Sequence, residues 1–106
     1  MNWRSKANLK YVEELKAQAP FTGALIPLPG GEVVKVRFVM RGEWAFYQEG
    51  ERATLLEAFA GFGIINRRSI TRWDTGEVIS EAEAERIIAA VSEALRRGGS
   101  QDVRVE

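Results

Sequence analysis

The sequence predicts an α+β fold in which an antiparallel sheet of four or five strands is packed on one face by a C-terminal helix. Helical periodicity marks residues 5–19 and 81–97, and the intervening residues 32–73 carry strand-like patterns separated by short turns. Short turns join antiparallel neighbours, because a parallel connection needs a crossover of a dozen or more residues. We expect residues 1–106 to form a single domain, since a chain of this length buries about 65% of its unfolded surface.

The first predicted helix begins after Ser5, whose hydroxyl is a good N-cap, and ends before Pro20. Its apolar residues recur at intervals of three or four, the spacing of a one-sided helix. They are Leu9, Val12, Leu15 and Ala19. We expect this helix to cover an edge of the sheet or a neighbouring subunit. Residues 21–31 contain Gly30-Gly31 and two prolines, which predicts a connector.

Residues 32–40 and 43–48 predict a hairpin closed at Arg41-Gly42. The first strand alternates with a period of two, which is typical of a half-buried strand. Its apolar face holds Val34, Val36, Phe38 and Met40. We expect three aromatic residues of the hairpin to be buried on one shared face. They are Phe38, Trp44 and Phe46.

Residues 52–60 fit either a strand or a short helix, and the short turn at 49–51 favours a strand that pairs with the hairpin. Ile64-Ile65 starts a further strand. Residues 66–68 predict a polar turn or bulge, after which residues 69–73 continue the sheet.

Both ends of the C-terminal helix can be predicted from the sequence. Ser80 and Glu83 form the capping-box pattern, and Gly98-Gly99 stops the helix. Its apolar stripe consists of Ala84, Ile87, Ile88, Val91 and Leu95. Asp74-Thr75-Gly76 predicts a tight turn before the helix, and residues 102–106 alternate as an added edge strand would.

The chain contains neither cysteine nor histidine. Disulfides, thiolate nucleophiles and the usual general base are therefore absent, and we expect a protein that is not an enzyme and needs no cofactor or metal. An enzyme would have to depend on residues such as Glu57 or Asp74. No run approaches the roughly 18 apolar residues of a membrane helix, and the N-terminus lacks the apolar core of a secretory signal. These features predict a cytoplasmic protein that does not bind membranes.

The formal net charge is zero, yet its distribution is uneven. Residues 1–41 carry seven basic and three acidic side chains, whereas residues 42–106 carry eight basic and twelve acidic ones. Such asymmetry favours either an oppositely charged partner or two separately solvated faces.

Arg67, Arg68 and Arg72 form the densest basic group, close in sequence to Trp73. Arginine beside aromatic residues is common in protein-binding and nucleic-acid-binding surfaces, and we add Tyr47 to this group. The alternative is that the arginines pair with the glutamates at the start of the C-terminal helix. Nucleic acid is not the expected partner, because the pI is 6.4 and no recognition helix is present.

Glu57 lies in an apolar run and is the best candidate for a carboxylate with a perturbed pKa, because burial raises a carboxylate pKa. A surface-facing strand glutamate is the alternative. Unpaired strand edges offer a further binding surface, since their backbone groups accept a partner strand. Homodimerisation is therefore expected.

Residues 69–95 carry the pattern Ser-Ile-x-x-Trp, a polar loop, Ile-Ser, several acidic residues, Ile-Ile and Ala-Leu. With Tyr47 to Arg52, Glu57 and Ile64-Ile65, this pattern resembles one family of small bacterial immunity proteins from polymorphic toxin systems. The resemblance spans about residues 43–106. It implies a compact α+β domain that neutralises a cognate toxin by binding, with Trp73 and Ile70 as core anchors and no catalytic residue.

Together these features predict a non-enzymatic protein-binding domain that neutralises a bacterial toxin or is an orphan module of a mobile element. The alternative is a module that binds small molecules or nucleic acid through Arg67, Arg68, Arg72 and the sheet aromatics.

Overall fold

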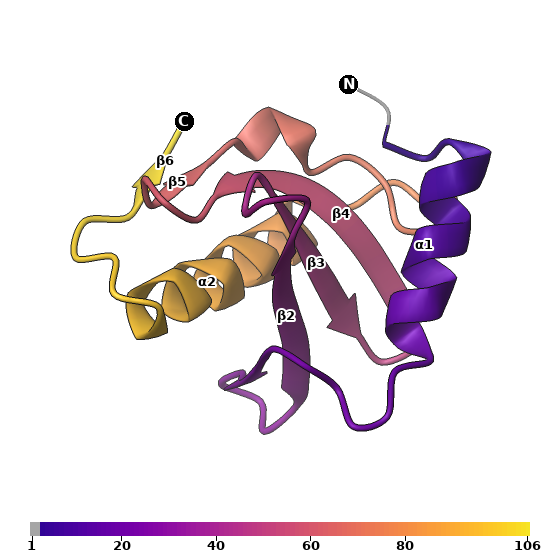
Figure 1. Ribbon diagram of the computed structural model, residues 1–106, viewed down its shortest axis with the longest axis horizontal. Helices are drawn as coiled ribbons and strands as arrows, with labels where there is room; N and C mark the ends of the chain where they lie inside the picture. Colours follow the sequence, from indigo (N-terminus) through magenta and orange to yellow (C-terminus); the bar gives the residue numbers. More distant parts are fainter. Residues whose placement is uncertain (1–2) are drawn as a thin grey trace.

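The computed structural model describes residues 3–106 and has an α+β architecture built on a curled six-stranded sheet (Figure 1). The strands are β1 (Ala24–Pro27), β2 (Val33–Val39), β3 (Trp44–Glu49), β4 (Arg52–Phe59), β5 (Ile64–Ile65) and β6 (Arg104–Val105). They lie in sequence order across the sheet, and all neighbours are antiparallel except β5 and β6, which are parallel. The predicted α+β class is confirmed, but the sheet is mixed and has more strands than the predicted four or five.

The additional strand is β1, in the segment that we predict as a connector. Ile26 is 3% exposed and pairs with Val34 of β2, so one β1 side chain enters the core. β1 has only four residues and ends at Pro27. A strand this short, bounded by glycine and proline, shows no alternation of apolar and polar residues in the sequence. It forms because the free backbone groups along one edge of β2 can pair with it.

The sheet is covered on both faces. Helix α2 (Glu81–Arg97) packs against β1, β2, β3 and β5, whereas α1 (Lys6–Lys16) packs against β4 on the other face (Figure 1). The packing of α2 on one face is as predicted. The expectation that the N-terminal helix covers an edge is wrong, because Val12 and Leu15 are buried over the sheet together with Leu55.

Burial on both faces changes the predicted arrangement of the hairpin aromatics. Phe46 and Trp44 pack in the α1-side cluster, while Phe38 packs in the α2-side cluster. The register explains this, because Phe38 lies opposite Ala45 and therefore on the other face from Trp44 and Phe46. The expectation of one shared face is wrong.

Helix α1 is shorter than the predicted 5–19. Ser5 is the N-cap, as expected, and its hydroxyl accepts a hydrogen bond from the Asn8 N–H at 3.1 Å. The helix ends at Lys16, and the next residues lead toward β1, where the Gln18 side chain accepts a hydrogen bond from Arg37 of β2 at 2.7 Å. This contact fixes the chain outside the helix.

Strand β4 confirms the preferred strand assignment for residues 52–60. Leu55 faces the α1-side cluster and Leu56 the α2-side cluster, and both are fully buried. A strand with two buried faces reads as a continuous apolar run, which is why its periodicity also fits a helix.

The predicted turn at residues 66–68 is present as the short 3₁₀ helix η1 (Arg67–Ser69). The expected strand at 69–73 is wrong, because only a single bridge joins Arg72 to Val78. Ser69 explains the difference: its hydroxyl accepts a hydrogen bond from the Glu57 N–H at 2.8 Å and donates one to the Asn66 carbonyl at 2.6 Å. The Ser69 side chain thus accepts the β4 backbone hydrogen bond that a further strand would otherwise accept.

The C-terminal predictions are confirmed. Helix α2 has the Ser80–Glu83 capping box, its apolar stripe is buried, and Gly98 is its C-cap. Strand β6 occupies the edge predicted at 102–106. None of the helices within residues 3–106 is long and apolar enough to cross a membrane.

Candidate functional site

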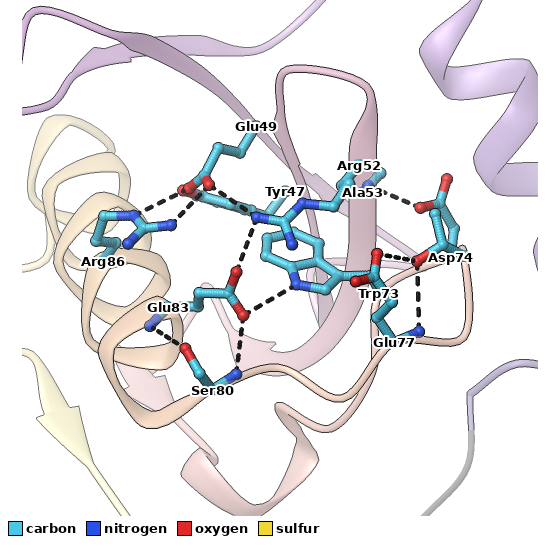
Figure 2. A network of polar contacts seen from close by, with 11 residues as sticks. Tyr47, Glu49, Arg52, Ala53, Trp73, Asp74, Glu77, Ser80, Glu83 and Arg86 are labelled. Carbon is cyan, nitrogen blue, oxygen red and sulfur yellow. Dashed lines mark hydrogen bonds and ion pairs between the residues drawn. The ribbon is translucent and has the colours of Figure 1, made fainter.

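A chain of four alternating charges joins the end of the β3–β4 hairpin to the start of α2 (Figure 2). Arg86 on α2 donates two hydrogen bonds to the Glu49 carboxylate, at 3.2 and 2.7 Å. Arg52 lies 3.4 Å from Glu49 and 2.8 Å from Glu83. The order Arg86, Glu49, Arg52, Glu83 therefore places each charge beside an opposite one.

Two buried aromatic residues complete this polar network. The Tyr47 hydroxyl donates a hydrogen bond to Glu49 at 2.7 Å, and the Trp73 indole N–H donates one to Glu83 at 3.3 Å. The Arg52 guanidinium lies 4.2 Å from the centre of a Trp73 ring, within the range of a cation–π contact. Tyr47 and Trp73 lie side by side, with their ring centres 6.1 Å apart.

The network sets the protonation states of its members. The Ser80 backbone N–H lowers the pKa of Glu83 to about 2; burial opposes this shift, and Arg52 and Trp73 support it. Burial would raise the pKa of Glu49, but hydrogen bonds from Arg86 and Tyr47 outweigh it and leave that pKa below its ordinary value. Burial, followed by the hydrogen bond to Glu49, raises the pKa of Tyr47. Both carboxylates are thus ionised and the phenol is neutral at physiological pH.

These protonation states of Glu49, Glu83 and Tyr47 suit groups that hold two elements together, and they do not suit a general acid and base. A general base needs a pKa near the working pH and access to a substrate proton. Glu49 is only 8% exposed and is enclosed by Tyr47, Arg52 and Arg86. The network therefore connects the hairpin to the helix and presents no reactive group to solvent.

Asp74 has a similar structural role on the other side of the sheet. One carboxylate oxygen lies 2.9 Å from Lys16 Nζ of α1, and the other accepts a hydrogen bond from the Ala53 N–H at 3.1 Å. Burial opposes the charged form of Lys16, but the hydrogen bond to Asp74 outweighs it and raises the pKa of Lys16. Asp74 thus ties α1 to β4 and is not free to act as a catalytic acid.

The structure separates the three predicted arginines. Arg67 lies 2.7 Å from Glu85 and 3.9 Å from Glu81 on α2, which is the alternative pairing that the sequence left open. Arg68 and Arg72 are exposed, and Arg72 donates a hydrogen bond to the Gly76 carbonyl at 2.9 Å. Among residues 3–106, no carboxylate lies within 4.0 Å of either guanidinium.

Arg68 and Arg72 are exposed on the same short segment, which runs from η1 to Val78, and Arg72 has an exposed apolar neighbour. Val78, bridged to Arg72, is 64% exposed, and the half-buried Ile70 lies between the two arginines in sequence. We call Arg68, Ile70, Arg72 and Val78 the η1 surface. Tyr47 does not reach it, because Tyr47 is fully buried within the polar network.

Glu57 is half-buried on β4, close to the start of η1. Asn66 Nδ2 donates a hydrogen bond of 3.5 Å to its carboxylate, and the Ser69 hydroxyl accepts the hydrogen bond of its backbone N–H. Asn66 also accepts a hydrogen bond from the Arg68 N–H at 3.1 Å, so Glu57 lies near the backbone of Arg68. The Glu57 side chain shares a β4 face with Phe59, two residues along the strand.

Both edges of the sheet are poor sites for a docking strand. The Leu28 N–H donates a hydrogen bond to the Glu32 carbonyl, toward β2. Because backbone groups alternate in direction along a strand, those of Leu25 and Pro27 point away from β2 and toward solvent. Arg97 already donates to the Leu25 carbonyl at 2.9 Å, and Pro27 has no N–H to offer. The opposite edge, β6, is only two residues long. These devices are typical of edges protected against pairing.

Three surface hollows lie away from the polar network. Two of them, of about 280 and 450 Å³, lie between the β1 side of the sheet and the C-terminal half of α2, and Arg97 lines both. The third, of about 280 Å³, lies between the β2–β3 and β4–β5 turns. Residues 3–106 contain no cluster of three or more acidic residues able to hold a metal ion.

The third hollow is bordered by a feature that sequence reasoning missed. Phe62 is 78% exposed at the tip of the β4–β5 turn, and Met40, on the β2–β3 turn, is 39% exposed. Met40 and Arg41 have φ values of 53° and 62°, left-handed conformations that cost non-glycine residues about 1–3 kcal/mol each. The available signal was Gly61-Phe62-Gly63, which places an aromatic residue between two glycines where no strand or helix can bury it.

A comparison of this chain with protein-family models, curated proteins and solved structures finds no match.

Proposed function

We propose that the protein is a non-enzymatic binding domain of the bacterial cytoplasm that neutralises a cognate toxin by contacting it through the η1 surface. The observation that carries this proposal is that Arg68 and Arg72 are both exposed on the segment that begins with η1, with the exposed Val78 bridged to Arg72. Neither guanidinium has a carboxylate within 4.0 Å among residues 3–106. An orphan module of a mobile element, with a protein partner other than a toxin, would use the same surface.

The state of the other ionisable groups supports binding over catalysis. The hydrogen bond from Arg86 keeps Glu49 ionised, and the Ser80 backbone N–H and then Arg52 keep Glu83 ionised. Asp74 is bound to Lys16. These groups connect secondary-structure elements and are unavailable for proton transfer. Exposed charged groups outside these contacts, such as Arg68 and Arg72, can instead contact a partner.

The chemistry of the η1 surface indicates the kind of partner. Arginine combines a charged head with a long apolar stem, and it is enriched among the residues that dominate binding energy at interfaces. Two arginines beside Val78 and Ile70 would suit a protein surface on which carboxylates surround an apolar centre. Nucleic acid is a poorer match, because Glu81 and Glu85 lie beside Arg67 at the border of this region.

The test is affinity purification of the tagged full chain from cells of its source organism, in parallel with the variant Arg68→Glu/Arg72→Glu. We expect the wild-type chain to retain one protein in stoichiometric amount and the variant to lose it. The control variant Lys6→Glu/Lys10→Glu makes the same change in charge on exposed residues of α1 and should retain the partner.

Three results would contradict the proposal. Recovery of only the chain itself would remove the protein partner, and equal retention by the Arg68→Glu/Arg72→Glu variant would place binding elsewhere. A complex that nuclease treatment dissolves would favour the nucleic-acid alternative. If a partner is recovered, co-expression should suppress its toxicity, and the same variant should fail to do so.

A further inference from the structure

Phe62 is the most exposed large apolar side chain among the described residues, and the fold does not require it there. It follows Gly61 in a turn closed by hydrogen bonds from the Phe62 and Gly63 N–H groups to the Phe59 carbonyl, at 3.0 and 2.9 Å. These are backbone bonds, which any side chain at position 62 would permit. Phe62 contributes nothing to the buried core, so its ring is available to contact another molecule.

The neighbouring β2–β3 turn lies against the β4–β5 turn, and it is a tight hairpin turn in which the Gly42 N–H donates a hydrogen bond to the Val39 carbonyl at 3.1 Å. Its residues Met40, Arg41 and Gly42 all have positive φ, so two side chains are held in a disfavoured conformation. The Ala60 N–H donates a hydrogen bond to the Gly42 carbonyl at 2.7 Å and fixes the two turns together.

Between the two turns lies the third hollow, of about 280 Å³. Gly42 and Gly61 contribute no side chains to its lining, while Phe59 and Phe62 make it apolar. Its volume is just below the 300 to about 1,000 Å³ of pockets for small molecules, which suits one inserted side chain better than a cofactor. A phenyl ring has the apolar character that this lining requires.

The charges at the rim identify the occupant. Arg41 and Glu43 are both exposed, one positive and one negative, and neither has an oppositely charged side chain within 4.0 Å among residues 3–106. A partner of a single charge sign would leave one of them unpaired. A second copy of the chain, related by a two-fold axis, would place Arg41 opposite Glu43 twice.

We propose that two copies of the chain form a symmetric dimer through the Phe62 surface, which consists of Arg41, Glu43, Phe59 and Phe62. Each Phe62 side chain inserts into the hollow of the other copy, and the Arg41 and Glu43 side chains pair across the interface. This route differs from the strand-edge pairing that the sequence suggested, and it shares no residue with the η1 surface.

The interface is small, so the dimer forms reversibly. An aromatic side chain buries about 150–250 Å², whereas stable interfaces bury roughly 1,200–2,000 Å² in total. Two inserted phenyl rings and four rim charges bury an area below or near the lower limit of this range. Association should therefore increase with protein concentration.

Analytical ultracentrifugation of the full chain tests the dimer. We expect the average mass to rise with concentration from 11.9 kDa toward twice that value. Phe62→Ser should remain at the monomer mass at every concentration, with an unchanged thermal unfolding midpoint because Phe62 is outside the core. The control Leu25→Ser removes another exposed apolar side chain, 54% exposed on β1, and should associate as the wild-type chain does.

Charge exchange tests the geometry of the pair. Arg41→Glu and Glu43→Arg should each be monomeric, because each places like charges opposite one another. An equimolar mixture of these two variants should recover association, since one chain then carries two negative and the other two positive rim charges. A folding defect could not be rescued in this way.

A wild-type chain that remains at the monomer mass would overturn the proposal. Association that survives Phe62→Ser, or that is lost in Leu25→Ser, would place the interface elsewhere. Failure of the Arg41→Glu and Glu43→Arg mixture to associate would refute the two-fold pairing.

Discussion

Replacing Glu83 by glutamine separates the two tasks of this side chain at the start of α2. Glutamine retains an oxygen that can accept the Ser80 N–H, so the capping box can persist. It removes the negative charge that faces Arg52 at 2.8 Å. The loss of stability in Glu83→Gln therefore measures the charge and not the cap.

The expected magnitude follows from the pKa of Glu83. Its carboxylate has a pKa of about 2, against an ordinary value of 4.5, and each pKa unit corresponds to about 1.4 kcal/mol. The ionised group therefore stabilises the folded state by at most about 3.5 kcal/mol. Because glutamine keeps part of the hydrogen bonding, we expect Glu83→Gln to lower the free energy of unfolding by about 2 kcal/mol at neutral pH.

The pH dependence has a definite sign. Above pH 4.5 the Glu83 carboxylate is ionised in both the folded and the unfolded chain, and its full contribution to stability is present. As the pH falls from 4.5 toward about 2, the unfolded chain takes up the proton first and the contribution declines. The difference in unfolding free energy between wild type and Glu83→Gln should therefore shrink over this interval and be small near pH 2.

Urea denaturation at a series of pH values measures this difference. The control is Glu81→Gln, in the first turn of the same helix, whose side chain is 90% exposed and lies 3.9 Å from Arg67. A surface pair of this kind contributes little, so its loss should cost less than about 1 kcal/mol. Equal costs for Glu83→Gln and Glu81→Gln at neutral pH, or a Glu83→Gln deficit that stays constant down to pH 2, would refute the reasoning.

Two further substitutions test other parts of the fold by the same denaturation measurement. Asp74→Asn removes the charge that faces Lys16 at 2.9 Å, in a side chain only 7% exposed, and should cost about 2–4 kcal/mol; a loss below 1 kcal/mol would mean that this pair does not hold α1 in place. Gly23→Ala would bring a Cβ within 2.6 Å of a backbone carbonyl oxygen of β2 and should cost about 1–3 kcal/mol, whereas Gly30→Ala meets no atom within 4 Å and should be nearly neutral. Similar stability of the two glycine variants would contradict the close approach.

The parts of the fold that local chemistry decides could be predicted from the sequence. Helix α2 is recognisable because Ser80 and Glu83 cap it and because its apolar residues repeat at helical spacing. The antiparallel order of β2, β3 and β4 follows from turns too short for any other connection. Each of these features depends on residues within one turn or one helix.

Features that depend on distant residues could not be predicted in this way. In β3, Ala45, Phe46 and Tyr47 are consecutive and all fully buried, because α1 covers one face and α2 the other. A period of two cannot reveal a strand that is buried on both faces. A sheet with only one buried face would place Phe38 on the same face as Trp44 and Phe46 and would leave α1 at an edge of the sheet. Both expectations are wrong because the sheet is buried on both faces.

The same limit applies to the functional residues. Glu49 and Arg86 are separated by 37 positions and become a bidentate pair only when α2 packs on the hairpin. The sequence predicts that Tyr47 lies with the surface arginines, yet its hydroxyl donates a hydrogen bond to Glu49 inside the protein. Burial decides which polar side chains are available, and burial is a property of the assembled fold.

The assembled fold also restricts where a partner can bind. Helices α1 and α2 cover the two faces, Arg97 and Pro27 obstruct the β1 edge, and β6 presents only two residues at the other edge. Recognition is then left to turns and irregular segments, which are the parts that this scaffold positions without burying. The Phe62 surface and the η1 surface both belong to such segments. Because they share no residue, binding of a second copy and binding of a different protein can be separated by single substitutions.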